Sequence, residues 1–261
     1  MNAVMDKEGA RTEHTCLLTL SLARELNQFP MESSFFQFLN QRECPELSDY
    51  LKRLNQVLQL SKETFKDAYS YGQILSKLWM VDALYGLLPR SRRYNVAIHG
   101  GWIGMTATLL FWRMNDLIEK IYSFDKDSRW APIADELNKY YTADHWRFKS
   151  STLDVLDLKE PTYEFVTHRH SGQEIRLKFQ PDIVINSSCE HMEDFKGWYD
   201  ALPTKTLLVL QSNNYFQGQG HINCALDYEE FALSTPMQDL FYEGVLDLDR
   251  YQRFLRIGIK K

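Results

Sequence analysis

From Tyr94 onward, short apolar runs alternate with segments whose apolar positions repeat at the spacing of a helix. The runs at 182–186 and 206–211 are almost continuously apolar, as expected for strands that are buried on both faces of a parallel sheet. The alternation therefore predicts an α/β fold. We expect strands at 94–99, 121–125, 146–149, 182–186 and 206–211, and helices at 104–116, 130–140 and 195–202.

Before this alternation begins, the apolar positions follow only a helical period. One apolar stripe covers residues 17–26. Pro45 begins a second helix, because proline is favoured at the first helical position. Ser61 is a suitable N-cap for a third helix that continues to residue 89. We predict a helical N-terminal extension over residues 1–90 and a single α/β domain over residues 91–261.

Two segments carry the strand pattern of antiparallel hairpins. Residues 162–179 interrupt the alternation, and their two strand-like halves are separated by a turn at Ser171–Gly172. This pattern predicts a β-hairpin inserted into the α/β domain. Further along, residues 240–248 and 251–259 are joined by a two-residue link and predict a second antiparallel pair.

The composition is that of an ordinary globular protein, with 44% hydrophobic and 25% charged residues in 261 positions. A net charge of −5 and a pI near 5.8 disfavour nucleic acid as a partner, because phosphate binding needs a basic surface. The four cysteines are scattered and show no disulfide framework. Neither a signal peptide nor a membrane-spanning run is evident. We expect a cytoplasmic protein without a membrane role.

A glycine-rich turn follows the first predicted strand. The run Val-Ala-Ile-His-Gly-Gly-Trp-Ile-Gly ends at Gly104, and the next strand ends in Asp125. Strand, glycine turn, helix, strand and acid follow one another as in a nucleotide-binding half-sheet, where the acid accepts hydrogen bonds from ribose hydroxyls. Asp127, two residues after Asp125, is an alternative for this role or an N-cap of the next helix. We predict a nucleotide cofactor bound by His99, Gly100, Gly101, Trp102, Gly104, Asp125 and Lys126.

This order of elements, with the closing antiparallel pair, resembles the class I S-adenosylmethionine-dependent methyltransferase family over residues 70–261. The resemblance implies a Rossmann-like, mostly parallel seven-stranded sheet, and S-adenosylmethionine as the cofactor. Gly100 and Gly104 match the outer glycines of the family's turn. Trp102 stands in place of the middle glycine, and Ile98 in place of the usual acid. The resemblance further implies that the cofactor's adenine contacts Asp154 and Val155.

Polar residues follow the fourth predicted parallel strand in the run Asn186–Met192. Ligands of open α/β sheets bind beyond the carboxyl ends of the strands. We therefore expect Asn186 and Ser187 to contact the cofactor, and Glu190 and His191 to reach the substrate. Imidazole titrates near neutrality, which makes His191 the expected general base. Glu190 and His221 are the further catalytic candidates.

The loops after the fourth and fifth parallel strands should be neighbours, which would bring Cys189, His191, His221 and Cys224 together. A set of this kind could bind a metal ion. The spacings of these residues are loose, however, and cysteines in the interior of a protein usually serve only to pack. We therefore expect no metal.

These features predict an S-adenosylmethionine-dependent methyltransferase that acts on a small metabolite or a protein side chain. The fourth strand does not lead into the Asn-Pro-Pro-Tyr signature of family members that methylate amino groups of nucleic acids. Two alternatives stay open. One is a nicotinamide-dependent oxidoreductase, which the turn and Asp125 also permit. The other is a non-catalytic interaction protein, in which Trp102 blocks the cofactor site.

Overall fold

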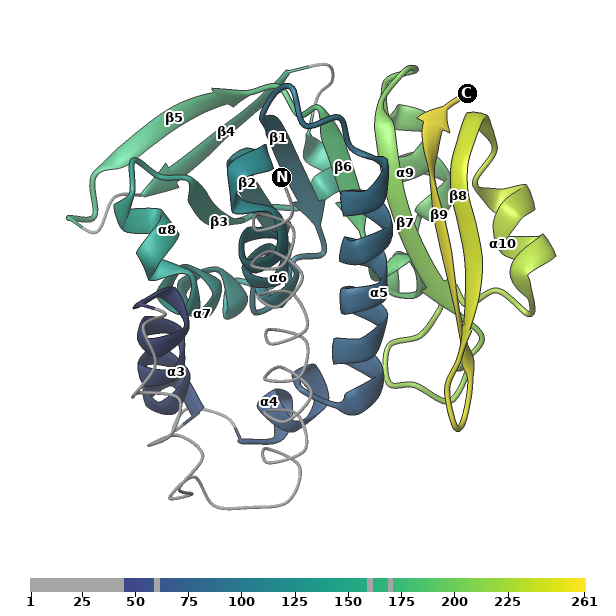
Figure 1. The fold of residues 1–261 in the computed structure, drawn as a ribbon, viewed down its shortest axis with the longest axis horizontal. Helices are drawn as coiled ribbons and strands as arrows, with labels where there is room; N and C mark the ends of the chain where they lie inside the picture. Colours follow the sequence, from purple (N-terminus) through teal and green to yellow (C-terminus); the bar gives the residue numbers. More distant parts are fainter. Residues whose placement is uncertain (1–44, 59–61, 159–161, 169–170) are drawn as a thin grey trace, which may run out of the picture.

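Seven strands form one mostly parallel sheet (Figure 1). The computed structural model describes residues 45–58, 62–158, 162–168 and 171–261. In sheet order the strands are β3 (Phe148–Thr152), β2 (Ile118–Asp125), β1 (Tyr94–His99), β6 (Ile183–Asn186), β7 (Leu207–Asn213), β9 (Gln252–Lys260) and β8 (Met237–Asp247). β9 runs opposite to the other six strands of this sheet. The predicted fold class is confirmed.

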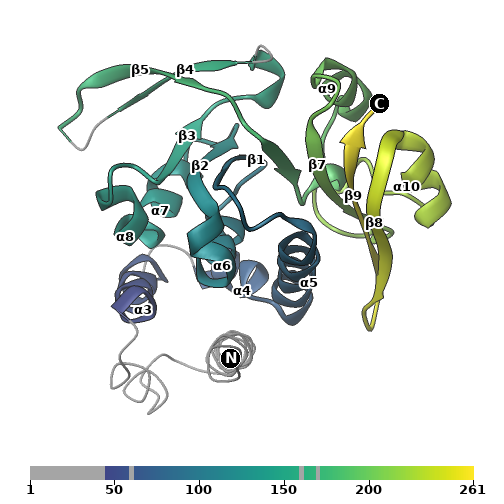
Figure 2. The same cartoon turned by 45° about the horizontal axis from the view of Figure 1, so that its top comes forward.

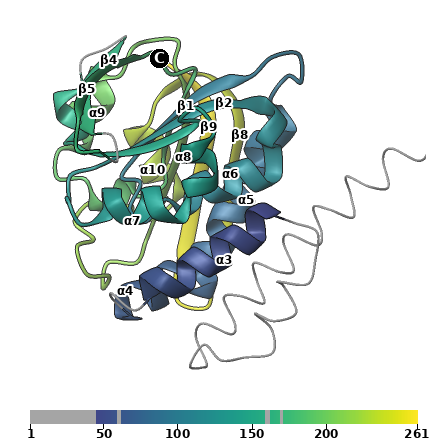
Figure 3. The same ribbon diagram turned by 90° about the vertical axis from the view of Figure 1, so that its left-hand side faces the viewer.

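Helices cover both faces of the sheet. α5 (Tyr71–Leu87), α6 (Met105–Met114) and α7 (Trp130–Leu137) lie on one face, and α9 (Phe195–Ala201) lies on the other (Figure 2). α3 (Pro45–Leu58) packs against α7 and α8 (Lys139–Ala143), farther from the sheet (Figure 3). The remaining α-helices of the described residues are α4 (Lys62–Ala68) and α10 (Tyr228–Ser234).

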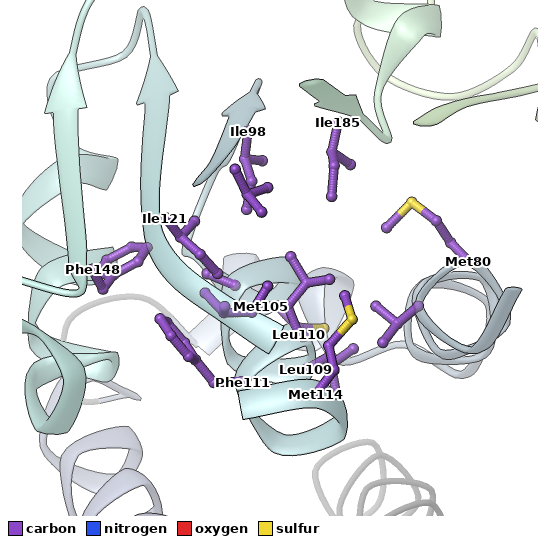
Figure 4. Close-up of a cluster of buried hydrophobic side chains, with 14 of the residues drawn as sticks. Met80, Ile98, Met105, Leu109, Leu110, Phe111, Met114, Ile121, Phe148 and Ile185 are labelled. Carbon is purple, nitrogen blue, oxygen red and sulfur yellow. The ribbon is translucent and has the colours of Figure 1, made fainter. Parts of the chain in front are cut away.

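Each central strand contributes side chains to two cores, because successive residues of a strand face opposite sides of the sheet. Ile98 of β1 belongs to the core beneath α5 and α6, whereas Ala97 belongs to the core beneath α9. Figure 4 shows Ile98, Ile121 and Ile185, from three neighbouring strands, facing Leu110 of α6. Burial of each such side chain contributes about 1.5–3 kcal/mol. The near-continuous apolar runs in the sequence reflect this two-sided burial.

The hairpin predicted at 162–179 consists of β4 (Tyr163–His168) paired antiparallel with β5 (Glu174–Phe179). Alternate residues of β4 are buried. Phe165 and Phe179 pack edge-on against Tyr122 of β2, with ring centroids 5.2 and 4.4 Å apart. The hairpin therefore covers the sheet on the same face as α9, in the stretch of chain where a crossover helix is usual between parallel strands (Figure 2).

Two helix predictions are wrong in their extent. The helix predicted from residue 61 to 89 is divided into α4 and α5, because Ser70 caps α5 by accepting a hydrogen bond from the Gln73 amide at 3.4 Å. The helix predicted over 130–140 is divided at Asn138 into α7 and α8. The Asn138 side chain bonds back to the backbone of α7 and so marks the end of that helix.

The strand predicted at 146–149 is also displaced: β3 begins only at Phe148. His145 and Trp146 have positive φ values, 49° and 57°. This backbone region is incompatible with a strand. Trp146 therefore belongs to the turn that precedes β3, although its bulk and apolar character favoured a strand.

Three further expectations concern the N-terminal segment, membrane-spanning helices and the domain boundary. The apolar stripe at 17–26 lies outside the described residues. Within the described ranges, no helix combines the length and the apolar character that crossing a membrane requires. The domain boundary at residue 90 stays a prediction.

Candidate functional site

The turn after β1 needs glycine for two different reasons. Gly100 and Gly104 have φ values of 70° and 79°, a region that other residues rarely adopt. At Gly101 the reason is space, since a Cβ would lie 1.7 Å from the Ser123 hydroxyl oxygen. The amides of Gly100 and Gly101 both donate to the Phe124 carbonyl, at 2.9 and 3.0 Å. These bonds hold the turn against β2.

Asp125 ends β2 directly beside this turn. Its carboxylate accepts hydrogen bonds from the backbone amides of Trp102, at 2.9 Å, and Asp127, at 3.0 Å. A carboxylate can accept about four hydrogen bonds, so each oxygen keeps a free lone pair. The side chain is partly exposed, and its partial burial raises the pKa of the Asp125 carboxyl. An acid placed in this way can accept hydrogen bonds from two hydroxyls of a ligand.

Trp102 combines a strained backbone with a ring that leans towards α7. Its φ is 47°, a value uncommon outside glycine and often found at functional sites. The ring packs edge-on against Trp130, the first residue of α7, with centroids 6.2 Å apart. Both indoles are partly exposed. Because Asp125 holds the Trp102 amide, the acid and the two rings form one local arrangement.

The predicted residues after β2 and β3 lie near this arrangement. Lys126 is exposed and takes part in a surface ion pair. The Leu153 amide donates to the Asp125 carbonyl at 2.9 Å, which places Asp154 beside the end of β2. Asp154 caps a short 3-10 helix, η2 (Val155–Asp157), of which Val155 is the first residue.

Asn138, which no sequence pattern singles out, supports the turn from behind. Its Nδ2 donates to the carbonyls of Gly104, at 3.2 Å, and Ala134, at 3.0 Å. Its Oδ1 accepts from the Thr108 hydroxyl at 2.9 Å. The residue is buried and ties the start of α6 to the end of α7. A lone asparagine within a helical pattern gives no signal of this role in sequence.

Alanine at Gly104 is expected to destabilise the protein more than alanine at Gly172. Both glycines have a φ of 79°, so each substitution costs about 1–2 kcal/mol in backbone strain. A Cβ at Gly172 meets nothing within 4 Å, whereas one at Gly104 lies 2.7 Å from Asn138 Nδ2. Crowding at Gly104 should add about 1–3 kcal/mol. Urea unfolding of the two variants measures the difference, and equal losses would contradict a supporting role for Asn138.

The His99 side chain lies in the core beneath α9. Trp198 Nε1 donates to His99 Nδ1 at 2.9 Å, so the neutral ring carries its hydrogen on Nε2. Burial lowers the pKa of His99 to about 3 and keeps the ring neutral. A ligand contact from this residue would therefore involve its backbone, which leads into the glycine turn.

Asn186 and Ser187 lie where the carboxyl ends of β1 and β6 meet. Asn186 pairs with His99 in the register of these two strands. Both Asn186 and Ser187 are buried, and Asn186 Oδ1 accepts a hydrogen bond from the Ser188 amide at 2.9 Å. The chain leaves β1 and β6 in opposite directions along the sheet, and ligands of open α/β sheets bind at such a switch point.

Glu190 is a buried acid in the short 3-10 helix η3 (Cys189–His191), which follows β6. Its Oε1 accepts from Asn213 Nδ2 at 2.6 Å and from Arg253 Nη1 at 3.3 Å. The Glu190 and Arg253 side chains are each only 2% exposed. Since Asn213 ends β7 and Arg253 belongs to β9, one carboxylate ties η3 to two neighbouring strands.

His191 and His221 meet beside this acid. Their ring centroids are 4.6 Å apart, and the rings are nearly perpendicular. One potential ligand atom from each of Glu190, His191 and His221 lies within 4.8 Å of the other two. His191 is exposed, whereas His221 is partly buried and its pKa is lowered by that burial. The structure thus brings together the three residues predicted as catalytic, which we call the imidazole cluster.

The two cysteines considered with these histidines do not both join them. Cys189 is buried, and its Sγ points to the Asn186 carbonyl at 3.5 Å. Cys224 Sγ lies 3.6 Å from His221 Nδ1, and burial raises the pKa of the thiol to about 11. Cys224 therefore stays protonated near neutral pH. Glu190, rather than Cys189, is the third member of the cluster.

A buried lysine, Lys77 of α5, adds a further charge near Glu190. The pKa of Lys77 is lowered from 10.5 to about 7; burial is the largest cause, the charge of Arg253 also lowers it, and Glu190 partly opposes the shift. Sequence contains a signal for this residue, because Lys77 falls on the same helical face as the apolar Ile74 and Val81. α5 therefore packs against the sheet and also carries a titratable group that interacts electrostatically with Glu190 of the imidazole cluster.

Replacing Lys77 with methionine is expected to stabilise the protein at pH 7 by about 1–3 kcal/mol, because a buried amine loses its hydration. The folded-state pKa of about 7 lies below the usual 10.5, so between these values only the unfolded chain holds the proton. Stability of the parent protein should then rise from pH 7 to 10. Chemical unfolding across this range should show the advantage of the variant shrinking with pH, and a constant gap would contradict the burial of Lys77.

Comparison with known proteins rests on structure alone. The sequence matches no known protein-family profile, and it matches no curated protein. Among solved structures, it is similar to the N-methyltransferase NodS from Bradyrhizobium japonicum WM9 in complex with S-adenosyl-L-homocysteine. The two share 13% identity, the match covers 81% of this chain and 98% of that one, and the TM-score is 0.51.

Two further solved structures are similar with lower scores. Magnesium protoporphyrin IX methyltransferase (ChlM) from Synechocystis PCC 6803 is 12% identical over 82% of this chain and 100% of that one, with a TM-score of 0.48. A putative methyltransferase from Bacillus halodurans C-125 is 12% identical over 71% and 99%, with a TM-score of 0.48. The strand order and the likeness to NodS show that this chain has the fold of class I S-adenosylmethionine-dependent methyltransferases.

Proposed function

We propose that the protein is an S-adenosylmethionine-dependent methyltransferase. The observation that carries this proposal is the glycine turn and Asp125 at the carboxyl edge of a sheet in which β9 enters antiparallel between β7 and β8. The turn and the acid alone would suit any nucleotide. Dinucleotide-binding sheets of the Rossmann type, however, are mostly parallel, and their usual strand order 3-2-1-4-5-6 has no seventh strand inserted between the last two. The antiparallel β9 therefore favours methyl transfer over hydride transfer.

The groups at the carboxyl edge fit this cofactor. Asp125 would accept hydrogen bonds from both ribose hydroxyls through its free lone pairs. Gly100 lacks the side chain that would separate the backbone from a ligand. The other residues that we propose to contact the cofactor are His99, Gly101, Trp102, Gly104, Lys126, Asp154, Val155, Asn186 and Ser187. In the comparison, the structure of NodS contains S-adenosylhomocysteine.

The imidazole cluster would face the methyl acceptor because its two segments lie close to the glycine turn that follows β1. η3 follows β6, which is next to β1, and the loop with His221 follows β7, which is next to β6. His191 is the proposed base, with Glu190 and His221 beside it. The net charge of −5 supports a small metabolite or a protein side chain as the acceptor, rather than a nucleic acid.

Catalysis by these residues would consist mainly of positioning. The bound cofactor would supply a methyl group on a positively charged sulfur, which passes to a lone pair of the acceptor and leaves S-adenosylhomocysteine. His191 would take the proton that the acceptor releases. Trp102 and Trp130 would form a wall that limits the access of water to the turn.

Calorimetric titration with S-adenosylmethionine, S-adenosylhomocysteine and NAD⁺ tests the proposal. We expect saturable binding of the first two ligands and none of NAD⁺. Binding of NAD⁺ without S-adenosylhomocysteine would favour an oxidoreductase. Binding of none of the three would favour a non-catalytic protein, in which the Trp102 ring closes the site.

A further inference from the structure

We propose that the imidazole cluster, formed by Glu190, His191 and His221, binds a divalent transition-metal ion. One potential ligand atom from each of the three residues lies within 4.8 Å of the other two. Ligands at about 2.0–2.2 Å around a single ion fall within such a distance of each other. Two imidazoles and one carboxylate also form a recurrent set for Zn²⁺ and Fe²⁺.

The hydrogen bonds of the two imidazoles prepare them to bind an ion. His191 Nδ1 lies 2.9 Å from the Gly220 carbonyl, and His221 Nδ1 lies 2.7 Å from the Tyr215 carbonyl. A carbonyl oxygen can only accept, so Nδ1 carries the hydrogen in both rings. The lone pair of each neutral ring is then on Nε2. Histidines that bind metals are usually oriented by a bond of this kind from the other ring nitrogen.

One oxygen of the Glu190 carboxylate is available to bind the ion. Glu190 Oε1 is bound by Asn213 and Arg253, whereas Oε2 is buried and has no hydrogen-bond partner among the described residues. A buried oxygen without a partner is unfavourable, and a cation at the cluster would satisfy it. Arg253 meanwhile fixes the orientation of the carboxylate through Oε1.

The ligand types select the class of ion. Imidazole nitrogens suit Zn²⁺, Fe²⁺, Co²⁺ or Ni²⁺, whereas Mg²⁺ and Ca²⁺ prefer oxygen ligands throughout. This inference departs from the expectation of no metal, which considered a cysteine and histidine set. The fold instead turns the Cys189 thiol towards the Asn186 carbonyl and offers Glu190 in its place.

The role of the ion rests on the proposed function, although its binding does not. An ion at the cluster would coordinate the oxygen or nitrogen of the acceptor and lower its pKa, so that the proton leaves to solvent before methyl transfer. The ion would then replace His191 as the means of activating the acceptor, because the ring's lone pair would be held in coordination.

Binding can be tested with Co²⁺, which gives visible d–d absorption when it is coordinated by protein nitrogen and oxygen atoms. Protein treated with EDTA and desalted would be titrated with Co²⁺, and displacement by Zn²⁺ would follow. His191→Gln and His221→Gln remove one ligand each, and both side chains are at least partly exposed. His168→Gln, on the exposed side of β4, is the matched control.

We expect stoichiometric Co²⁺ binding in the parent protein and in His168→Gln. Each cluster variant should weaken binding by at least about 100-fold, since loss of an outer-shell partner alone costs about 10- to 100-fold. Absence of stoichiometric binding, or equal binding by the cluster variants, would overturn the metal site. Calorimetry with S-adenosylhomocysteine on the same samples separates the two proposals, because cofactor binding can succeed where Co²⁺ binding fails, and the reverse.

Discussion

Alanine in place of Asp125 is expected to weaken binding of S-adenosylhomocysteine by at least about 100-fold. Two hydroxyl hydrogen bonds to a carboxylate contribute about 1.5–3 kcal/mol each, and about 1.4 kcal/mol corresponds to a factor of ten. The same substitution removes the acceptor for the Trp102 amide, so the glycine turn loses one of its supports. Calorimetric titration of the parent and the variant measures the change in Kd directly.

Two further variants separate ligand contact from damage to the turn. Asp127→Ala changes an acid two residues away whose side chain bonds to Arg129, and it should leave the affinity nearly unchanged. Asp125→Asn keeps one carbonyl oxygen but loses the charge, and it should give an intermediate affinity. If Asp125→Ala bound S-adenosylhomocysteine as tightly as the parent, the assignment of this acid to the ribose would be wrong.

Removal of the Glu190 carboxylate is expected to lower the free energy of unfolding by about 3–5 kcal/mol, the usual cost of breaking a buried ion pair from one side. In Glu190→Ala the Arg253 guanidinium stays buried but loses its counter-ion. Lys77, whose pKa Glu190 raises, also loses that stabilising influence. Asn213 loses the acceptor for its side-chain amide. Urea unfolding in the presence of EDTA measures the loss without any contribution from bound metal.

A surface ion pair provides the comparison for this large effect. Glu193→Ala breaks the exposed pair with Lys126 and should change stability by less than about 1 kcal/mol. In the double variant Glu190→Leu, Arg253→Met, no unpaired charge is left from the pair, so much of the loss should be recovered. A Glu190→Ala loss no larger than that of Glu193→Ala would show that Arg253 is hydrated or paired elsewhere.

Most of the fold could be predicted from sequence because the central strands β1, β6 and β7 are buried on both faces. The apolar runs that became β6 and β7 and the strand patterns around both hairpins were sufficient to identify the sheet and its antiparallel end. The predicted bounds were wrong where a local cap or backbone turn interrupts the periodic pattern of apolar residues. Ser70 divides one helix by capping α5. Positive φ values at His145 and Trp146 place the start of β3 two residues later than predicted. No glycine marks this turn in the sequence.

The candidate site was only partly visible in sequence. Parallel topology alone predicts that the loops after β6 and β7 are neighbours, which is why His191 and His221 could be considered together. What sequence could not supply is the direction of side chains. It gave no reason to expect that His99 would point into the core, or that Glu190 would pair with Arg253 from β9. The latter contact joins positions that are far apart in the chain.

The position of β9 has a consequence for the order in which the protein folds. β9 lies between β7 and β8, yet in the chain it directly follows β8, while α10 and β8 separate it from β7. Contacts between chain neighbours form sooner than distant ones, because closing a short loop costs less entropy. The β8–β9 hairpin can therefore assemble first and dock onto β7 as a unit. Arg253 would travel with it, so the buried charge meets Glu190 only as the two parts of the sheet join.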